Sequence, residues 1–216
     1  MIIDTKDKGK NLNNAEGMMK KVDGVDESMV MIEKKIMDHN ALATELQNKY
    51  PDMTAPVREK MDGIVETSAN TNKKVSSRRA ELESSLQYHK FVDDIGELQL
   101  WLTDLDKKIK ADIVPNSASE ADALMEEHQE RMGELTGRQE TFGKSKEFGE
   151  HLLAENHGES DSIKEEMEKL AEMREAVGQS WEKTRVQLDD IKSWLKEKTQ
   201  VALDESYYDL SNMQVN

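Results

Sequence analysis

The feature that most constrains the fold is an internal repeat, in which apolar positions recur at a fixed offset of 106 residues. Ala15 corresponds to Ala121 and Leu82 corresponds to Leu188, and no gap is needed between these pairs. A repeat of this length that keeps one register is typical of a modular array. The same offset joins Met29 to Leu135, Ile36 to Phe142, Val57 to Ile163, Met61 to Met167 and Ile64 to Leu170.

Within each repeat the apolar residues alternate between steps of four and three, which predicts helices that bury one face. Three such seams occupy residues 91–109, 125–153 and 163–195, and turn-forming residues at 115–117 and 156–160 separate them. Polar residues interrupt the second seam, which consists of Met125, His128, Met132, Leu135, Gln139, Phe142, Lys146, Gly149 and Leu153.

Two further seams, at 22–50 and 57–82, repeat this plan on either side of a predicted turn at 51–56. The segment between Leu82 and Phe91 contains neither proline nor glycine, so we expect one helix to run from the first repeat into the second. The predicted fold class is all-α, with tandem antiparallel three-helix bundles joined by continuous helices.

The predicted domains are an incomplete repeat at 1–84, a complete repeat at 85–189 and a shorter segment at 190–216. The first contains only the second and third helices of a bundle. The last is either a shortened first helix of a further repeat or a C-terminal tail.

The composition agrees with narrow seams on long helices. The chain is 36% hydrophobic and 35% charged, whereas ordinary globular domains are about 45–50% apolar and about 25% charged. The predicted bundle core consists of Phe91, Leu98, Trp101, Leu102, Leu135, Phe142, Leu170, Val177, Trp181 and Leu188.

The charge and the motifs argue against several functional classes. A net charge of -15 disfavours nucleic acid as a partner, and the chain has no stretch of about 18 apolar residues that would predict a transmembrane helix. Without cysteine there is neither a disulfide framework nor a thiolate metal site. We therefore predict no enzyme activity, no cofactor and no metal.

Three local motifs have a structural interpretation that outweighs a chemical one. Residues 143–145 spell Gly-Lys-Ser, but they lie in a helical seam without the spacing of a phosphate-binding loop. His157, Ser160 and Asp161 lie at a turn, where Ser160 or Asp161 is expected to cap a helix. Ser119 and Asp122 have the spacing of a capping box, which predicts a helix start there.

Several segments resemble the spectrin-repeat family. They are FVDDIGELQLWLTDLDKKIK with Trp101, the stretch from ADALMEEHQERMGELTG to HGESDSI, and IKEEMEKLAEMREAVGQSWEKTRVQL with Trp181. The segment WLKEKTQVALDESYYDLSN is similar to a form found more in alpha than in beta spectrin chains. The chain departs from the family at Ser68 and Arg174, where many spectrin repeats have a second tryptophan.

The resemblance implies a structural role in the cytoplasm, in the cytoskeleton beneath the plasma membrane. Spectrin repeats form rods that pair with a sister chain and cross-link actin, and some bind ankyrin. The implied function is therefore a rod segment that spaces and cross-links components of the membrane skeleton. The alternative is a helical adaptor that captures a protein partner such as ankyrin on one bundle face.

A bundle that lacks one helix leaves an apolar surface open to association. We therefore expect homo-association through the incomplete end repeats, in which the last helix of one molecule fills the groove of another. A rod segment whose ends have no such role is the alternative. The candidate association surface consists of Val25, Met29, Ile32, Ile36, Met61, Ile64, Ile191, Trp194 and Leu195.

Overall fold

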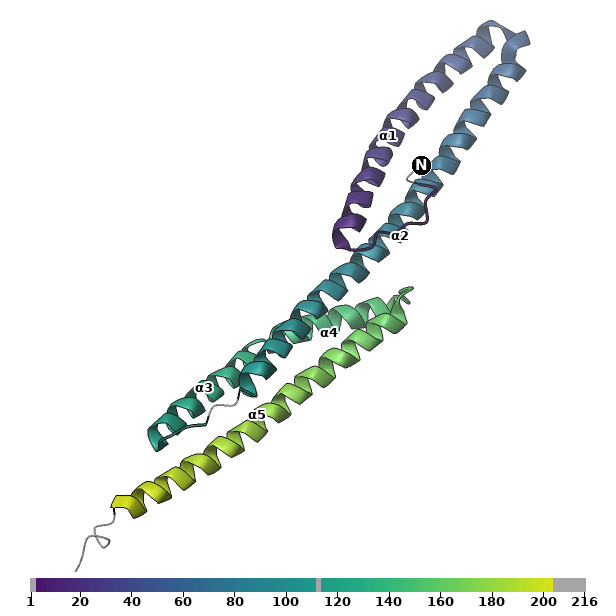
Figure 1. The fold of residues 1–216 in the computed structure, drawn as a ribbon. Helices are drawn as coiled ribbons and strands as arrows, with labels where there is room; N and C mark the ends of the chain where they lie inside the picture. Colours follow the sequence, from purple (N-terminus) through teal and green to yellow (C-terminus); the bar gives the residue numbers. More distant parts are fainter. Residues whose placement is uncertain (1–2, 112–113, 204–216) are drawn as a thin grey trace, which may run out of the picture. The chain divides into compact units, whose positions relative to one another are not determined.

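The structure is a computed structural model that describes residues 3–111 and 114–203. Every regular element in these residues is a helix, which confirms the predicted all-α class (Figure 1). In chain order the elements are α1 (Leu12–Lys49), the 3₁₀ helix η1 (Pro51–Met53), α2 (Thr54–Ile109), α3 (Ala118–Gly137), α4 (Gln139–Ala154) and α5 (Ser160–Leu203).

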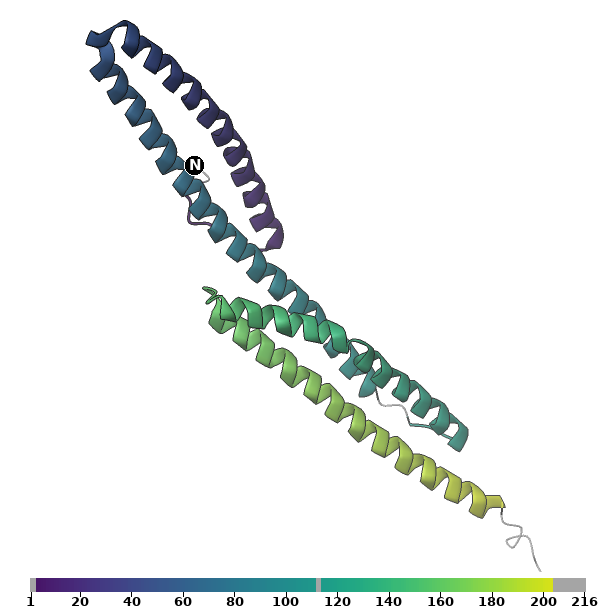
Figure 2. The ribbon, with the colours of Figure 1, turned by 180° about the vertical axis from the view of Figure 1, so that it is seen from behind.

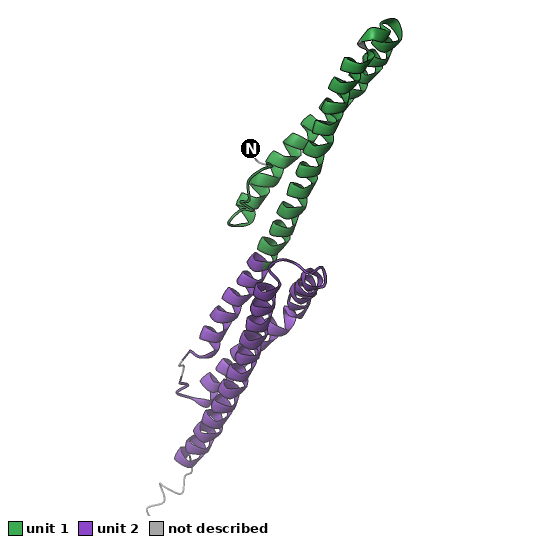
Figure 3. Cartoon of the chain, turned by 90° about the vertical axis from the view of Figure 1, so that its right-hand side faces the viewer, with its two compact units in different colours: residues 1–91 green, residues 92–216 purple. Residues whose placement is uncertain are grey.

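The chain divides into two compact units, residues 1–91 and 92–216 (Figure 3). Helix α2 contributes its first part to unit 1 and its last part to unit 2 without a break. The predicted continuous helix between the repeats is thus confirmed. The boundary between the units lies after Phe91, while the predicted boundary between the first two domains lies after residue 84.

In unit 1, α1 and the first part of α2 run antiparallel, with η1 between them (Figures 1 and 2). Val22 of α1 and Val75 and Leu82 of α2 form a small buried cluster with Ile3, which precedes α1. Pro56 lies in the first turn of α2, where a proline is tolerated because the missing N–H would have no partner within the helix. The turn therefore ends earlier than the predicted 51–56.

In unit 2, α3 and α4 pack against α5, and α2 contributes its residues 92–109. Along α2 the seam is buried at every predicted position from Phe91 to Ile109. On α5 the buried positions are Ile163, Leu170, Val177 and Leu188, and the residues between them in the seam are half-buried. One of the two seam positions in each heptad thus forms the centre of the core.

The second helix of unit 2 is broken, although the sequence pattern predicts one continuous helix. Helix α3 ends at Gly137, and α4 begins at Gln139 after Arg138 takes a backbone conformation of φ -90° and ψ 6°. Glycine has low helix propensity, which makes this a weak point. Beyond the break the predicted seam positions Phe142 and Gly149 are buried, but the other two buried positions are Ser145 and Leu152 in place of Lys146 and Leu153.

The start of α3 also differs from the prediction. Ser117 is the N-cap, and its side chain accepts a hydrogen bond of 3.2 Å from the backbone N–H of Glu120. The Glu120 carboxylate in turn accepts one of 2.8 Å from the backbone N–H of Asn116. The predicted cap pair Ser119 and Asp122 lies inside the helix instead. The corresponding cap of α1 is Asn11, again 106 residues away.

Candidate functional site

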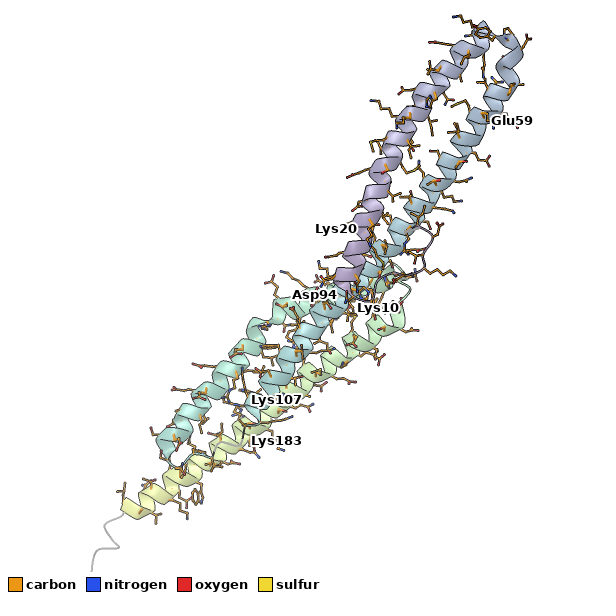
Figure 4. All side chains as sticks on the ribbon, turned by 45° about the horizontal axis from the view of Figure 1, so that its top comes forward. Lys10, Lys20, Glu59, Asp94, Lys107 and Lys183 are labelled. Atoms are coloured by element: carbon orange, nitrogen blue, oxygen red, sulfur yellow. The ribbon has the colours of Figure 1, made fainter. Side chains whose placement is uncertain are left out.

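An apolar groove of about 570 Å³ lies between α1 and the first part of α2 in unit 1. Two helices close only two sides of their shared seam, so apolar side chains such as Ile32 and Ile64 remain exposed there. Glu59, labelled in Figure 4, contributes to the α2 wall. The groove is lined by Met29, Ile32 and Ile36 of α1 and by Glu59, Lys60, Gly63, Ile64, Thr67, Ser68 and Thr71 of α2.

The structure brings together only part of the predicted association surface. Met29, Ile32, Ile36 and Ile64 share the groove, although Met29 is already buried. Val25 packs against the buried cluster of unit 1, so it belongs to the core rather than to a free surface.

The remaining predicted association residues lie outside the groove lining. Met61 is half-buried on α2. Ile191 and Leu195 are half-buried on α5, while Trp194 between them is 56% exposed. Residues 204–216 of the predicted tail lie outside the described residues.

A polar clamp at the other end of unit 1 was not predicted. The side chains of Arg78, Ser85 and His89 on α2 each bond a main-chain carbonyl of residues 7–9. Ser85 Oγ donates to the Lys8 carbonyl at 2.9 Å, and His89 Nε2 lies 3.1 Å from the Gly9 carbonyl.

Arg78 is the most buried member of this clamp, at 2% exposure. Its guanidinium donates to the Asp7 carbonyl and forms a 3.0 Å ion pair with Glu81. A buried arginine is tolerated only when its charge is paired in this way. The sequence signal was present, because Arg78 lies between Val75 and Leu82 at the spacing of the seam, and Ser85 and His89 continue that spacing with polar residues.

Gly9 allows the segment to turn into α1. Its φ is +88°, a conformation that side chains disfavour. A Cβ at this position would lie 2.7 Å from the backbone nitrogen of Ala15. Glycine is therefore required here for both reasons.

The predicted core residues of unit 2 fall into two groups. Phe91, Leu98, Leu102, Leu135, Phe142, Leu170, Val177 and Leu188 are buried. Trp101 and Trp181 are only half-buried, so each indole also borders solvent.

His128 of α3 and Trp181 of α5 form a reciprocal contact. His128 Nε2 donates to the Trp181 carbonyl at 2.7 Å, because a carbonyl oxygen can only accept. Trp181 Nε1 donates to the His128 carbonyl at 2.8 Å, and the two rings stack with their centroids 5.2 Å apart. Burial lowers the pKa of His128 below its ordinary value, which favours the neutral ring.

Two arginines lie over aromatic rings at the helix break. The Arg138 guanidinium lies 4.5 Å from the Trp101 ring centroid, and the Arg174 guanidinium lies 4.8 Å from that of Phe142. Trp101 and Phe142 are themselves 6.2 Å apart. A cation–π contact contributes about 0.5–1 kcal/mol at an exposed site, such as the half-buried Trp101 ring. Arg174 thus packs at a seam position through its contact with an aromatic ring.

An ion pair joins the ends of α3 and α5 in unit 2. Lys192 Nζ lies 2.5 Å from Asp122 Oδ1. The hydrogen bond from Lys192 holds the pKa of the Asp122 carboxyl below its usual value and raises that of Lys192. The prediction of a cap at Asp122 therefore missed its actual role as a partner of α5.

The residues of the candidate phosphate-binding loop and of the His157 turn lie in a helix and at a helix start. Residues 143–145 lie within α4, and Ser145 is buried. At the turn before α5, His157 Nδ1 accepts a 3.0 Å hydrogen bond from the Glu159 N–H, and Ser160 Oγ donates to the His157 carbonyl. Ser160 is the first residue of α5.

The described residues contain neither a metal-binding cluster nor a membrane-spanning helix. No group of three or more histidine or carboxylate side chains there could hold a metal ion. No helix in that part of the chain is both long and apolar enough to cross a lipid bilayer.

The net charge of the chain comes entirely from one unit. Unit 1 has 15 basic and 15 acidic residues, whereas unit 2 has 15 basic and 30 acidic residues. The formal charge of -15 therefore belongs to unit 2. The groove lies in the neutral unit.

Comparison with known proteins agrees with this architecture. The family model of the spectrin repeat matches residues 86–190. The chain is 25% identical to the mouse erythrocytic spectrin alpha chain over 185 residues, which is 86% of this chain and 8% of the relative. It is 24% identical to the Drosophila spectrin beta chain over 182 residues, which is 82% of this chain and again 8% of the relative.

The helices pack against one another along their apolar seams, so the class of protein is a structural helical bundle. Residues 86–190 match the spectrin repeat, and the chain is similar to spectrin alpha and beta chains over most of its length. It spans about 8% of the length of the curated relatives that it matches.

Proposed function

We propose that this chain is a structural segment of a spectrin-type cytoskeletal protein, which spaces and cross-links components of the membrane skeleton beneath the plasma membrane. The match of residues 86–190 to the spectrin repeat supports this proposal. So does the similarity to spectrin alpha and beta chains over most of the chain. The proposed partners are a sister spectrin-like chain and, within a longer protein, actin-associated proteins.

The single observation that carries the association part of this proposal is the open groove of unit 1. A groove of about 570 Å³ with an apolar α1 wall offers a helix the third side of a bundle. We propose that a helix from another molecule occupies it. The C-terminal part of α5 is the candidate within this chain, because Trp194 is exposed there between Ile191 and Leu195.

The charge distribution favours the groove over other contacts between two copies. Unit 2 carries the whole net charge, so two copies of unit 2 repel each other. Unit 1 has no net charge and adds no such repulsion. Homo-association is therefore proposed to pair the groove of unit 1 with the apolar stripe of α5.

Sedimentation velocity of the chain at two protein concentrations tests this association. We expect the wild type to sediment faster at the higher concentration, and Ile64→Lys in the groove and Trp194→Lys on α5 each to abolish the change. Leu100→Lys is the matched control, because Leu100 is 74% exposed on α2 and does not line the groove. A wild type that is monomeric at both concentrations would refute homo-association.

The alternative function is a helical adaptor that captures a protein partner such as ankyrin on one bundle face. The surplus of acidic residues in unit 2 favours a partner with a basic surface. Such binding would weaken steeply as salt is raised from low to physiological concentration. If the affinity for the partner changes neither with salt nor with charge reversal on unit 2, an adaptor that binds through its acidic surface is excluded.

A further inference from the structure

A second cavity lies inside unit 2 and is separate from the groove. It has a volume of about 140 Å³ and is bounded by α2, α4 and α5. An apolar cavity of about 150 Å³ is large enough to hold benzene in a protein core. The apolar walls are Ile95, Phe142, Met167, Leu170 and Ala171.

Two cationic side chains complete the lining of this cavity. Arg174 on α5 and Lys146 on α4 are its charged members, and no acidic residue lines it. Arg174 is half-buried and Lys146 is exposed, whereas Ile95 and Phe142 are buried. The cavity therefore has an apolar interior and a cationic edge.

Both cations keep hydrogen-bonding capacity for a ligand. The Arg174 guanidinium donates from one nitrogen to Gln139 Oε1, and a guanidinium has five N–H donors in all. Lys146 lies 3.5 Å from Glu150 in a solvent-exposed pair, and such pairs contribute little and rearrange readily.

The charge of this edge is opposite to that of its surroundings, because unit 2 has twice as many acidic as basic residues. We propose that the cavity binds a compact apolar carboxylate, whose ring or short chain fills the space while its carboxylate lies against Arg174 and Lys146. Arginine pairs with carboxylates through two parallel hydrogen bonds, which suits an anionic group at this edge.

The size of the cavity limits the ligand to a single ring or a chain of similar volume. Benzoate is a suitable probe, since it combines a benzene ring with a carboxylate. For a ligand of this size we expect a Kd of about 1 mM. Benzyl alcohol has a similar shape without the charge, and it serves as the matched neutral ligand.

Titration of the ¹⁵N-labelled chain with benzoate, followed by amide chemical shifts, tests the proposal. We expect the largest shifts at the amides of Ile95, Phe142 and Ala171, and a Kd for benzyl alcohol that is about tenfold weaker. Arg174→Gln should weaken benzoate about tenfold and leave benzyl alcohol unchanged, while Arg174→Lys should recover part of the loss. Arg185→Gln is the matched control, because Arg185 pairs with Glu182 and does not line the cavity.

A variant that fills the cavity distinguishes the contribution of the cavity volume from that of the two cations. Ala171→Leu keeps both cations but adds a side chain at a wall position that is exposed to solvent, so folding should be preserved. We expect it to reduce binding of both ligands. Absence of localised shifts at about 20 mM benzoate would overturn the site. Equal Kd values for benzoate and benzyl alcohol would overturn the role of the carboxylate.

Discussion

His128 and Trp181 each donate a side-chain hydrogen bond to the main-chain carbonyl of the other, at 2.7 and 2.8 Å. The contact thus joins α3 and α5 at one position along both helices. A shift of either helix by one turn would break both bonds and leave buried polar atoms without partners, at a cost of about 1–3 kcal/mol for each group. The pair therefore specifies the register of the bundle as well as its stability.

A double-mutant cycle measures this coupling. Because each residue supplies one donor, His128→Leu and Trp181→Phe should each destabilise unit 2 by about 1–3 kcal/mol, with a coupling energy of at least about 0.5 kcal/mol. Urea unfolding followed by tryptophan fluorescence reports on unit 2, since all three tryptophans lie in it. Trp194→Phe is the control for an exposed tryptophan. Additive effects of the two variants would contradict a shared contact.

The stability of unit 2 should depend on pH through His128. Burial lowers the pKa of the folded imidazole, and the nearby Arg131 and Arg185 act in the same direction, while the Trp181 carbonyl and Glu182 oppose it. The unfolded chain then binds a proton near pH 6.5, before the folded chain does. Stability contributed by neutral His128 is complete above about pH 6.5 and is lost as the pH falls through the folded pKa.

Urea titrations at pH 7.5 and 5.5 test this effect. The free energy of unfolding should fall by at most about 1.4 kcal/mol per pH unit in this window. Glu182 should contribute little there, because hydrogen bonds from Arg185 hold the pKa of its carboxyl below the ordinary value. His128→Leu should remove the dependence. An unchanged dependence in that variant would assign it to other groups.

Two leucines on α2 provide a matched test of the core. Leu102 is 0% exposed, whereas Leu100 on the same helix is 74% exposed. Leu102→Ala should therefore destabilise unit 2 by about 2–5 kcal/mol, and Leu100→Ala by less than about 0.5 kcal/mol. The midpoint of thermal unfolding, read by tryptophan fluorescence, compares them directly. Equal losses would mean that the helix is rotated relative to the structure.

Two glycines provide a matched test of the segment before α1. Gly9→Ala should destabilise unit 1 by about 1–3 kcal/mol, since its positive φ is strained for alanine and the new Cβ would meet Ala15. Gly17 lies within α1, and a Cβ at this position would meet open space. Gly17→Ala should therefore stabilise unit 1 by about 0.5–1 kcal/mol. Amide hydrogen exchange along α1 measures both. Slower exchange in Gly9→Ala would contradict the proposed strain.

Much of this architecture could be predicted from the sequence because the seams are local and periodic. The spacing of 91–109 predicted buried positions on α2 correctly, because nothing breaks the helix there. After Arg138 the same reasoning places Phe142 and Gly149 correctly but misses Ser145 and Leu152, each one residue before the predicted Lys146 and Leu153. Periodicity assumes one continuous helix, so it does not show that the break at Arg138 moves this second seam position by one residue.

The contacts that were missed join residues far apart in the chain. The clamp connects Arg78 to a carbonyl 71 residues earlier, and the sequence alone does not show main-chain partners. The groove was predicted in part, because a bundle with only two helices must leave seam residues such as Ile32 exposed. The positions of Met29 and Val25 in the core were not predicted, because the burial of these two side chains depends on the non-local cluster around Val22.

The clamp of unit 1 has a consequence for sequence variation within a family of such proteins. Arg78, Ser85 and His89 bind carbonyl oxygens, which every amino acid supplies. The Lys8 side chain is exposed, so neutral drift at this position should be tolerated, whereas the Asp7 carboxylate accepts a 3.0 Å hydrogen bond from the Gly9 N–H. Gly9 and Arg78 should instead be fixed by purifying selection, the first by its backbone conformation and the second by its buried charge.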